Sequence, residues 1–290
     1  MSTKISVITV CFNAASELPV TIESVLAQDY TDYEYIIQDG NSTDSTDQVV
    51  EGYRKFFDSK NIKLTYNKMP DDGIYDAMNK AVACAEGDYI NFMNAGDSFY
   101  SAETLSSVIE SLDAARSNSE QLPDIIYGDC AVYEYGVFYR FNKSLKDIEE
   151  AMPFSHQSTF ARRDLLIAHP FKTCYRYSAD YDFLLTMHDL GRSFHDSNCL
   201  VCITNADGVS SVNYHDTLVE SALILKDHGK YHHSDKELKK DKAVLKIKQF
   251  VMDYFPDFIK KTIRLLQIKS RGQKLNIEIP PWYVSHLTKK

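Results

Sequence analysis

The stretch Met69–Phe99, MPDDGIYDAMNKAVACAEGDYINFMNAGDSF, decides how the chain folds. Its first half predicts a helix, because apolar residues recur at helical spacing: Ile74, Ala77, Met78, Ala81, Val82 and Ala85. Tyr89–Met93 then predicts a short buried strand, which ends in the polar corner Asn94-Ala95-Gly96-Asp97. In open α/β sheets, ligands bind at the carboxyl ends of the strands. A carboxylate placed there is suited to hold a divalent metal on a diphosphate.

The segments before this stretch show the same alternation of strand and helix. Residues 5–12, ISVITVCF, are nearly all apolar, which is typical of a strand buried on both faces. Further strands are expected at 33–38 and 62–66, and amphipathic helices follow the first two strands. This order predicts a parallel, doubly wound sheet with right-handed crossovers. Because no G-x-G-x-x-G follows the first strand, a bound phosphate needs another neutraliser, and a metal is the natural candidate.

The pattern changes after Asp97. Residues 103–115 predict a helix, residues 133–141 a hairpin around Gly136, and a further helix begins near Asp180. From residue 223 onward the pattern is helical and basic. We therefore divide the chain into a nucleotide-binding half, an acceptor-binding half and a C-terminal extension, at residues 1–98, 99–222 and 223–290.

Charge is distributed unevenly along the 290 residues. The formal net charge of −9 argues against a general nucleic-acid binder. Residues 226–290 contain 16 Lys and Arg against 7 Asp and Glu, a net +9, whereas residues 1–225 contain 16 against 34, a net −18. Residues 1–4 lead directly into a strand, without a signal peptide, and no apolar run is long enough to span a bilayer. A cytoplasmic location is therefore expected.

Five ordered motifs resemble a known family: ISVITVCFN, IIQDGNSTDST, GIYDAMNKAVACAEGDYINFMNAGDSF, HQSTFARRDLL and SADYDFLL. Together they are similar to the inverting family-2 glycosyltransferases of the GT-A fold, above all to the bacterial branch that builds capsule, exopolysaccharide and O-antigen. The resemblance covers about residues 4–215. It implies an α/β, Rossmann-like mixed and mainly parallel sheet flanked by helices, with a helical C-terminal extension.

On the donor side, the resemblance implies that the stretch Thr9 to Asn13 lines the nucleotide pocket, with Thr9, Val10 and Asn13 as its site residues, and that Asp39 contacts the uracil or another base. Asp39 also fits a simple turn residue. Asn94, Ala95 and Gly96 are expected at the donor. Asp97 matches the last carboxylate of the family's metal motif and is the expected ligand of Mn²⁺ or Mg²⁺. The motif usually contains a pair of acids, so this chain departs from it.

Three residues around the mid-domain helix complete the expected donor site: Asp72, Asp76 and Asn79. Asp72 alternatively caps that helix. The family often has Arg before the Asn, whereas Met78 precedes Asn79 here. The contacts with the diphosphate must therefore differ from those of the family.

On the acceptor side, Asp180 matches the family's catalytic base, although Ala179 stands where an acid usually precedes it. Asp180 also fits a helix cap. His156 and Gln157 are expected to contact the diphosphate or the acceptor sugar, and His156 equally fits a structural role. Asp182 is expected in the same group and is the reserve base.

The C-terminal extension has its own pattern. Its apolar stripe is flanked by Lys260, Lys261, Arg264 and Lys269, and it consists of Phe255, Phe258, Ile259, Ile263 and Leu266. A basic amphipathic helix of this kind lies on an anionic membrane surface. The alternative is a helix packed on the body or in a homo-oligomer. On the membrane interpretation, the residues from Lys246 onward are removable without unfolding the nucleotide site.

These expectations combine into one function. The chain would move a single sugar, with inversion, from a nucleotide-sugar donor, preferably UDP-linked, to a lipid-linked saccharide at the inner face of the cell membrane. The absence of a Q-x-x-R-W motif and of membrane spans speaks against a processive synthase. Two alternatives remain: a nucleotidyltransferase, which would need a basic Gly-rich loop after the first strand, and a nucleotide-sugar-binding scaffold with little turnover.

Overall fold

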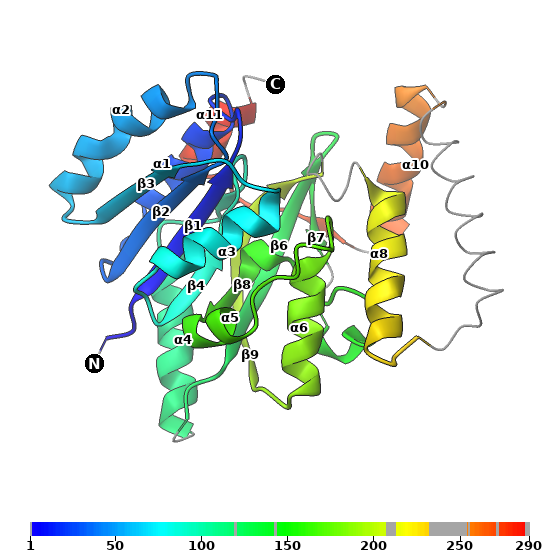
Figure 1. Ribbon diagram of the computed structural model, residues 1–290. Helices are drawn as coiled ribbons and strands as arrows, with labels where there is room; N and C mark the ends of the chain where they lie inside the picture. Colours follow the sequence, from blue (N-terminus) through cyan, green and yellow to red (C-terminus); the bar gives the residue numbers. More distant parts are fainter. Residues whose placement is uncertain are drawn as a thin grey trace.

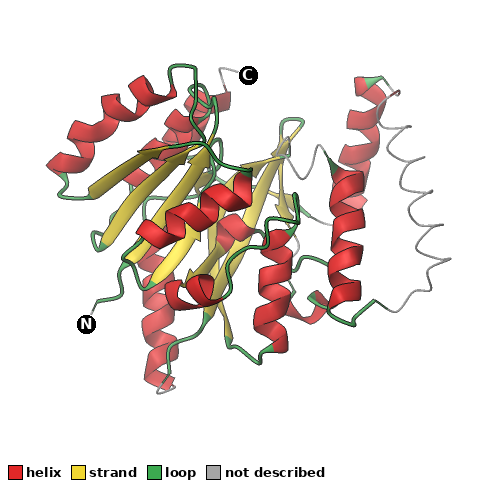
Figure 2. Cartoon of the chain, viewed as in Figure 1, coloured by secondary structure: helices red, strands yellow, loops and turns green. Residues whose placement is uncertain are grey.

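One sheet with helices on both faces forms the body of the molecule (Figures 1 and 2). The structure is a computed structural model, and it describes residues 2–118, 121–141, 144–206, 213–231, 254, 256–270 and 273–287.

The N-terminal half of the sheet is parallel. Its strands are β1 (Ile5–Cys11), β2 (Tyr33–Asp39), β3 (Lys63–Lys68) and β4 (Tyr89–Phe92). They are connected by α1 (Leu18–Leu26), α2 (Thr46–Ser59) and α3 (Ile74–Cys84). Ile8 of β1 pairs with Ile36 on one side and with Phe92 on the other, so β1 is central. All seven residues of β1 are buried, as its apolar sequence predicts.

The second half continues the same sheet, mainly with antiparallel pairs. Its strands are β5 (Ser98–Phe99), β6 (Ile125–Glu134), β7 (Val137–Phe141), β8 (Thr159–Arg162) and β9 (Phe194–Asn205). β8 pairs antiparallel with β4 and β6, whereas β9 runs parallel to β6. The helices here are α4 (Thr104–Asn118), α5 (Arg163–Ala168), α6 (Ala179–Asp189) and α8 (Tyr214–Asp227), with the 3-10 turns η1 (Leu145–Asp147) and η2 (His156–Ser158).

Two hydrophobic layers hold the helices to the sheet. On one face, α1, α2 and α4 bury residues such as Leu18, Phe57 and Leu105. On the other face, α3, α5 and α6, which lie in front of the sheet in Figure 1, bury residues such as Met78 and Phe183. Burying a side chain of this size contributes about 1.5–3 kcal/mol. The strand ends between the layers are therefore rigid supports for a site.

The C-terminal segment is part of the body. It contains α10 (Asp257–Ser270), β10 (Lys274–Leu275) and α11 (Pro281–Leu287). β10 extends the sheet beside β7, and α11 lies beside α1 (Figure 1). Ile268 of α10 and Tyr283 of α11 are almost completely buried. The helical extension is confirmed, but its end is not the removable appendage that the sequence predicted; Phe255 lies outside the described residues.

The predicted mixed α/β sheet with flanking helices is confirmed. The sequence missed β8, β10 and the full length of β6. The three-part division stays a prediction. One sheet spans the boundary between residues 98 and 99, and α8 spans the boundary between residues 222 and 223. Among the described residues, no helix is long and apolar enough to cross a bilayer.

Candidate active site at the strand ends

The loop after β4 is held in place by α1. The fully buried hydroxyl of Thr21 donates to the carbonyl oxygens of Asp97 (2.7 Å) and Asn94 (3.2 Å) and accepts from the Gly96 N–H (3.0 Å). Gly96 has φ +94°, a conformation that a residue with a side chain rarely adopts. The loop that presents Asp97 therefore has a fixed backbone.

Asp180, in the first turn of α6, has a partner on each carboxylate oxygen. The Tyr75 hydroxyl from α3 donates to Oδ1 at 2.9 Å, and His156 Nδ1 lies 2.8 Å from Oδ2. Burial, followed by the negative charge of Asp180, raises the pKa of Tyr75 well above its ordinary value, so the hydroxyl remains a donor. Asp180 is thus oriented by groups from two other segments.

The 3-10 turn η2 connects this carboxylate to the loop after β4. His156 Nε2 lies 3.0 Å from Asn94 Nδ2, and Gln157 Nε2 donates to Asp97 Oδ2 at 2.7 Å. An amide nitrogen can only donate, so with Asn94 in this orientation His156 accepts at Nε2 and donates from Nδ1 to Asp180. The structure therefore brings together five of the predicted site residues, from three separate segments.

Asp39, at the end of β2, is completely buried. Its Oδ1 accepts from the Ser42 backbone (2.8 Å) and hydroxyl (2.6 Å), and its Oδ2 accepts from the Tyr66 hydroxyl. Asn13, at φ +50°, binds the same loop by accepting at Oδ1 from the Thr43 N–H at 2.8 Å. Both residues shape the loop after β2, and the predicted contact of Asp39 with a base stays a prediction.

Three residues beside this loop were not singled out as site residues by the sequence interpretation: Phe12, which lies inside the stretch expected to line the nucleotide pocket, Gly40, and Asp71, which was considered only as a helix cap. Phe12 directly follows a buried strand, yet it is 63% exposed. A Cβ on Gly40 would lie 2.6 Å from the Asp71 carboxylate and 3.4 Å from the Phe12 ring, so a larger residue there would displace the Asp71 side chain. The sequence did contain a signal for this site: the bulky apolar Phe12 stands just beyond the first strand, and the acidic pair Asp71 and Asp72 follows the third strand.

This end of the sheet is electronegative. Burial, and after it the charges of Asp39, Asp44 and Asp71, raise the pKa of the Cys11 thiol to about 12. The carboxylates of Asp39, Asp44 and Asp71 therefore place negative charge near the end of β1.

Thr9 and Val10 belong to the core beneath this end of the sheet. The Thr9 hydroxyl donates to the Met93 carbonyl at 2.6 Å, and Val10 packs on the α3 face. Their side chains are buried. A contact of their backbone with a donor stays a prediction.

The polar residues of α3 have local partners. Asp76 accepts from the Asp72 N–H at 2.9 Å and pairs with Lys80 at 2.7 Å, and these contacts lower the pKa of Asp76 below its ordinary value, Lys80 first. Asn79 donates to the Phe171 carbonyl (2.8 Å) and accepts from the Phe171 N–H (2.9 Å). Asp76 therefore holds the segment that enters α3, and Asn79 anchors the segment before α6; their donor contacts stay predictions.

The structure places Asp182 away from this cluster, which corrects the expected grouping. Its buried carboxylate binds Lys172 Nζ at 2.9 Å and lies 3.2 Å from His228 Nε2. Residues two apart on a helix do not face each other, so Asp182 points away from Asp180. It is a structural anchor for α8 and for the segment before α6.

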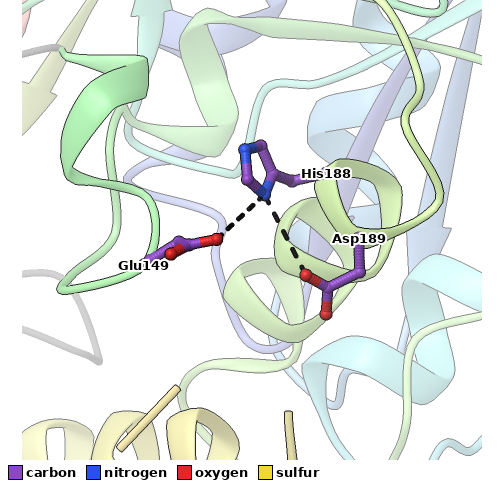
Figure 3. A group of neighbouring side chains, drawn as sticks. All are labelled: Glu149, His188 and Asp189. Atoms are coloured by element: carbon purple, nitrogen blue, oxygen red, sulfur yellow. Dashed lines mark ion pairs between the residues drawn. The ribbon is translucent and has the colours of Figure 1, made fainter. Parts of the chain in front are cut away.

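Within the described ranges, one group of three metal-ligating side chains has its ligand atoms within 4.8 Å of one another: Glu149, His188 and Asp189 (Figure 3). His188 Nδ1 is 3.7 Å from Glu149 and 4.0 Å from Asp189. The Lys230 ammonium contacts the same two carboxylates, at 3.4 Å from Asp189. A lysine therefore already neutralises this group, and it does not include Asp97.

Comparison with known proteins identifies the family. The family model for "Glycosyl transferase family 2" matches residues 6–183. A PGL/p-HBAD biosynthesis glycosyltransferase of Mycobacterium bovis is 32% identical over 179 residues, which cover 61% of this chain and 67% of that protein. An uncharacterized glycosyltransferase of Haemophilus influenzae is 26% identical over 274 residues, covering 90% of this chain and 77% of that protein.

Solved structures share the fold. TarS 1-349 of Staphylococcus aureus in complex with UDP superposes with a TM-score of 0.57 at 21% identity, covering 76% of this chain and 65% of that one. The mannosyltransferase PcManGT of Pyrobaculum calidifontis in complex with GDP-Man and Mn²⁺ gives 0.60 at 16% identity, covering 100% and 80%. At these identities the likeness concerns the fold alone. The chain belongs to glycosyl transferase family 2, and it is a glycosyltransferase with the GT-A fold.

Proposed function

We propose that this glycosyltransferase moves a single sugar, with inversion, from a nucleotide-sugar donor to an acceptor hydroxyl, with Asp180 as the general base. The observation that carries the proposal is the placement of Asp180. Its carboxylate is oriented by Tyr75 and His156, and η2 connects it to the loop that presents Asp97. A base and a group for the leaving diphosphate therefore stand at the same edge of the sheet.

The donor is proposed to bind at the ends of β1 and β2. The exposed Phe12 ring offers a face on which a base can stack, and Asp71 offers an acceptor beside it. A uracil donor is favoured, because TarS and a glucosyl-3-phosphoglycerate synthase of Mycobacterium tuberculosis were solved with UDP, whereas PcManGT was solved with GDP-Man.

A divalent cation is proposed at Asp97. The carboxylate oxygen of Asp97 suits Mn²⁺ or Mg²⁺, and the remaining positions would be filled by diphosphate oxygens and water, as is usual for Mg²⁺. When bound, the ion neutralises the leaving diphosphate. The electronegative strand ends support this need for a cation. Gln157 orients the Asp97 carboxylate through its Nε2–H.

The chemical step uses the chain's own base. The acceptor hydroxyl attacks the anomeric carbon while its proton passes to the Asp180 carboxylate, and the bond from that carbon to the diphosphate oxygen breaks. His156 and Tyr75 keep the carboxylate in position during this transfer. Asn94 fixes the other ring nitrogen of His156, so the imidazole cannot rotate freely.

The acceptor is proposed to be a lipid-linked saccharide of bacterial surface-polysaccharide biosynthesis, reached from an anionic inner-membrane surface. Support comes from α10, on which Phe258 is 70% and Leu266 is 62% exposed. Arg264 does not join this surface, because it binds Glu134 and the Tyr139 hydroxyl, both at 2.7 Å. Lys261 and Lys269 are exposed beside the apolar residues.

A transfer assay with a matched pair of variants tests the proposal. Nucleotide sugars are first screened by thermal shift with and without Mn²⁺, since a ligand that binds the native state raises the melting temperature. Transfer or slow donor hydrolysis is then measured for wild type, Asp180→Asn and Asp182→Asn. We expect Asp180→Asn to lower turnover by about 10²–10⁴-fold with unchanged nucleotide affinity.

The control separates chemistry from packing. Asp182→Asn carries the same change on the opposite side of α6 and should lower the melting temperature without a comparable loss of turnover. Equal turnover of wild type and Asp180→Asn would reject Asp180 as the base. Donor binding without any turnover in the wild type would favour the scaffold interpretation.

A further inference from the structure

The C-terminal helix is connected to the loop that presents Asp97. The hydroxyl of Tyr283, on α11, donates to Asn205 Oδ1 at 2.9 Å. Asn205, the last residue of β9, donates from Nδ2 to the Gly96 carbonyl at 3.2 Å. Two consecutive hydrogen bonds therefore lead from α11 to the centre of this loop.

Additional contacts bind the same corner. Trp282 Nε1 donates to the carbonyl of Phe99, in β5, just after the loop (3.1 Å). His286, also buried, has its Nε2 3.4 Å from Asn205 Nδ2. The loop that presents Asp97 is thus held by Thr21 of α1 and, through Asn205, by α11. These two helices also pack against each other.

Hydrophobic packing alone does not require the hydrogen bond from the Tyr283 hydroxyl to Asn205. Tyr283 is fully buried among apolar neighbours that include Val20 and Phe138. A phenylalanine would bury a ring of the same shape without a hydroxyl to satisfy, since a buried polar group must find a partner. The hydroxyl makes its contact with Asn205, the side chain that donates to the Gly96 carbonyl, so its orienting effect falls on the Asp97 loop.

We propose that α11 and Asn205 form a clamp that sets the position of Asp97, which makes the C-terminal segment part of the donor site. Tyr283 and Asn205 are positioning residues that act through the Gly96 backbone. The inference rests on the proposed donor role of Asp97. It assigns to the extension a task inside the molecule, separate from any membrane contact of α10.

The test compares three full-length variants with wild type. Tyr283→Phe removes only the hydroxyl of the clamp. Asn205→Asp keeps the acceptor for Tyr283 but loses the donor to Gly96. Tyr33→Phe is the matched control, because it removes another buried hydroxyl, which donates to the Val25 carbonyl of α1 at 2.8 Å.

Two readouts are taken for each variant. The first is amide hydrogen exchange of residues 94–99 without ligand, which reports how firmly the loop is held. The second is the dissociation constant of UDP with and without Mn²⁺. We expect faster exchange and a five- to tenfold weaker Mn²⁺-dependent affinity in Tyr283→Phe and Asn205→Asp, as for the loss of about one hydrogen bond, and no such change in Tyr33→Phe.

The outcomes separate this proposal from the proposed function. Equal effects of Tyr283→Phe and Tyr33→Phe would overturn the clamp and leave Tyr283 as a packing residue. Faster exchange with unchanged Mn²⁺-dependent affinity would overturn its role at the donor. If the wild type binds neither UDP nor a nucleotide sugar, the proposed function fails with the donor role, while the exchange data still report whether the loop is held.

Discussion

At the scale of single residues, the groups that contact Asp180 and Asp182 distinguish their roles, whereas their positions in the sequence do not. Asp180 and Asp182 stand two positions apart on α6. Asp180 meets the hydroxyl of Tyr75 and the ring of His156, whereas Asp182 meets the ammonium of Lys172. The Asp182 carboxylate is already committed to its ion pair with Lys172 and to His228, so it is not presented to an acceptor hydroxyl. The geometry therefore favours Asp180 as the base.

Tyr75 offers a test of how much the orientation of Asp180 contributes. Tyr75→Phe keeps the ring that packs against Phe171 but removes the hydroxyl that donates to Asp180. We expect turnover to fall about tenfold, as for the loss of one hydrogen bond to a charged group, with little change in donor affinity. The measurement is kcat with saturating donor.

The control for that change is Tyr181→Phe, which removes a buried hydroxyl that donates to the Ile148 carbonyl at 2.7 Å. It should affect stability and leave kcat close to wild type. A similar loss of kcat in both variants would mean that the effect of Tyr75 is general packing.

Asp97 can be examined through its charge alone. Asp97→Asn keeps an oxygen to accept from Gln157 but removes the negative charge that a divalent ion requires. We expect UDP binding to become independent of Mn²⁺, measured by titration calorimetry with and without the ion. Retained Mn²⁺ dependence would contradict the assignment of Asp97 as the ligand.

Some of these residues were predictable from the sequence and others were not. Asp97 and Asp180 follow from ordered motifs, each at the end or start of an element. Tyr75 and Asp180 are 105 positions apart, and the pattern of an amphipathic helix alone marks Tyr75 as a core residue. The side chains of Thr9 and Val10 are buried, which the sequence did not show, because a continuous apolar run does not mark where a strand leaves the core.

At the scale of elements, sequence reasoning worked where a single period dominates. The run of β1 and the stripe of α3 were predicted within one or two residues. β9, FHDSNCLVCITN, mixes polar and apolar residues because one end is partly exposed while the other is buried. β10 has two residues and exists through its pairing with β7. Such strands are specified by tertiary contacts rather than by local propensity.

Asn79 tests whether α3 holds the segment before α6. Asn79→Ala leaves both the N–H and the carbonyl of Phe171 without their present partner. We expect a loss of about 1–3 kcal/mol in unfolding free energy, measured by urea denaturation. Asn79→Asp, which keeps the acceptor but places a carboxylate oxygen against the Phe171 carbonyl, should lose at least as much. A loss below about 0.5 kcal/mol for Asn79→Ala would show that the anchor is dispensable.

At the scale of the whole molecule, the C-terminal segment has two faces. Ile268 and Arg264 of α10, together with β10 and α11, tie it to the body. Removal of the residues from Lys246 onward would expose the partners of these groups, so truncation would also disturb packing inside the body. The opposite face of α10 remains exposed, so its role must be tested by surface substitutions.

The double variant Phe258→Asp with Leu266→Asp tests the membrane interpretation while the fold is kept. Both side chains are largely exposed, so the change should barely alter stability or the Mn²⁺-dependent affinity for UDP. We expect the wild type to co-sediment with phosphatidylglycerol-containing vesicles and the double variant to lose most of this binding. Apolar insertion is not screened by salt, whereas each basic residue near the surface contributes about 1 kcal/mol that fades within a Debye length.

The matched control is Ile167→Asp with Leu190→Asp, which introduces the same charge at two other exposed apolar residues, 52% and 51% accessible. Because residues 1–225 carry −18 and residues 226–290 carry +9, an anionic leaflet should repel the body and attract the extension. The control should therefore bind vesicles nearly as wild type does, and high salt should weaken the vesicle binding of the wild type only in part.

Equal loss of vesicle binding in both double variants would mean that added negative charge alone prevents binding. Equal retention, with a change in sedimentation mass of the α10 variant, would instead assign this face to contact between copies of the chain.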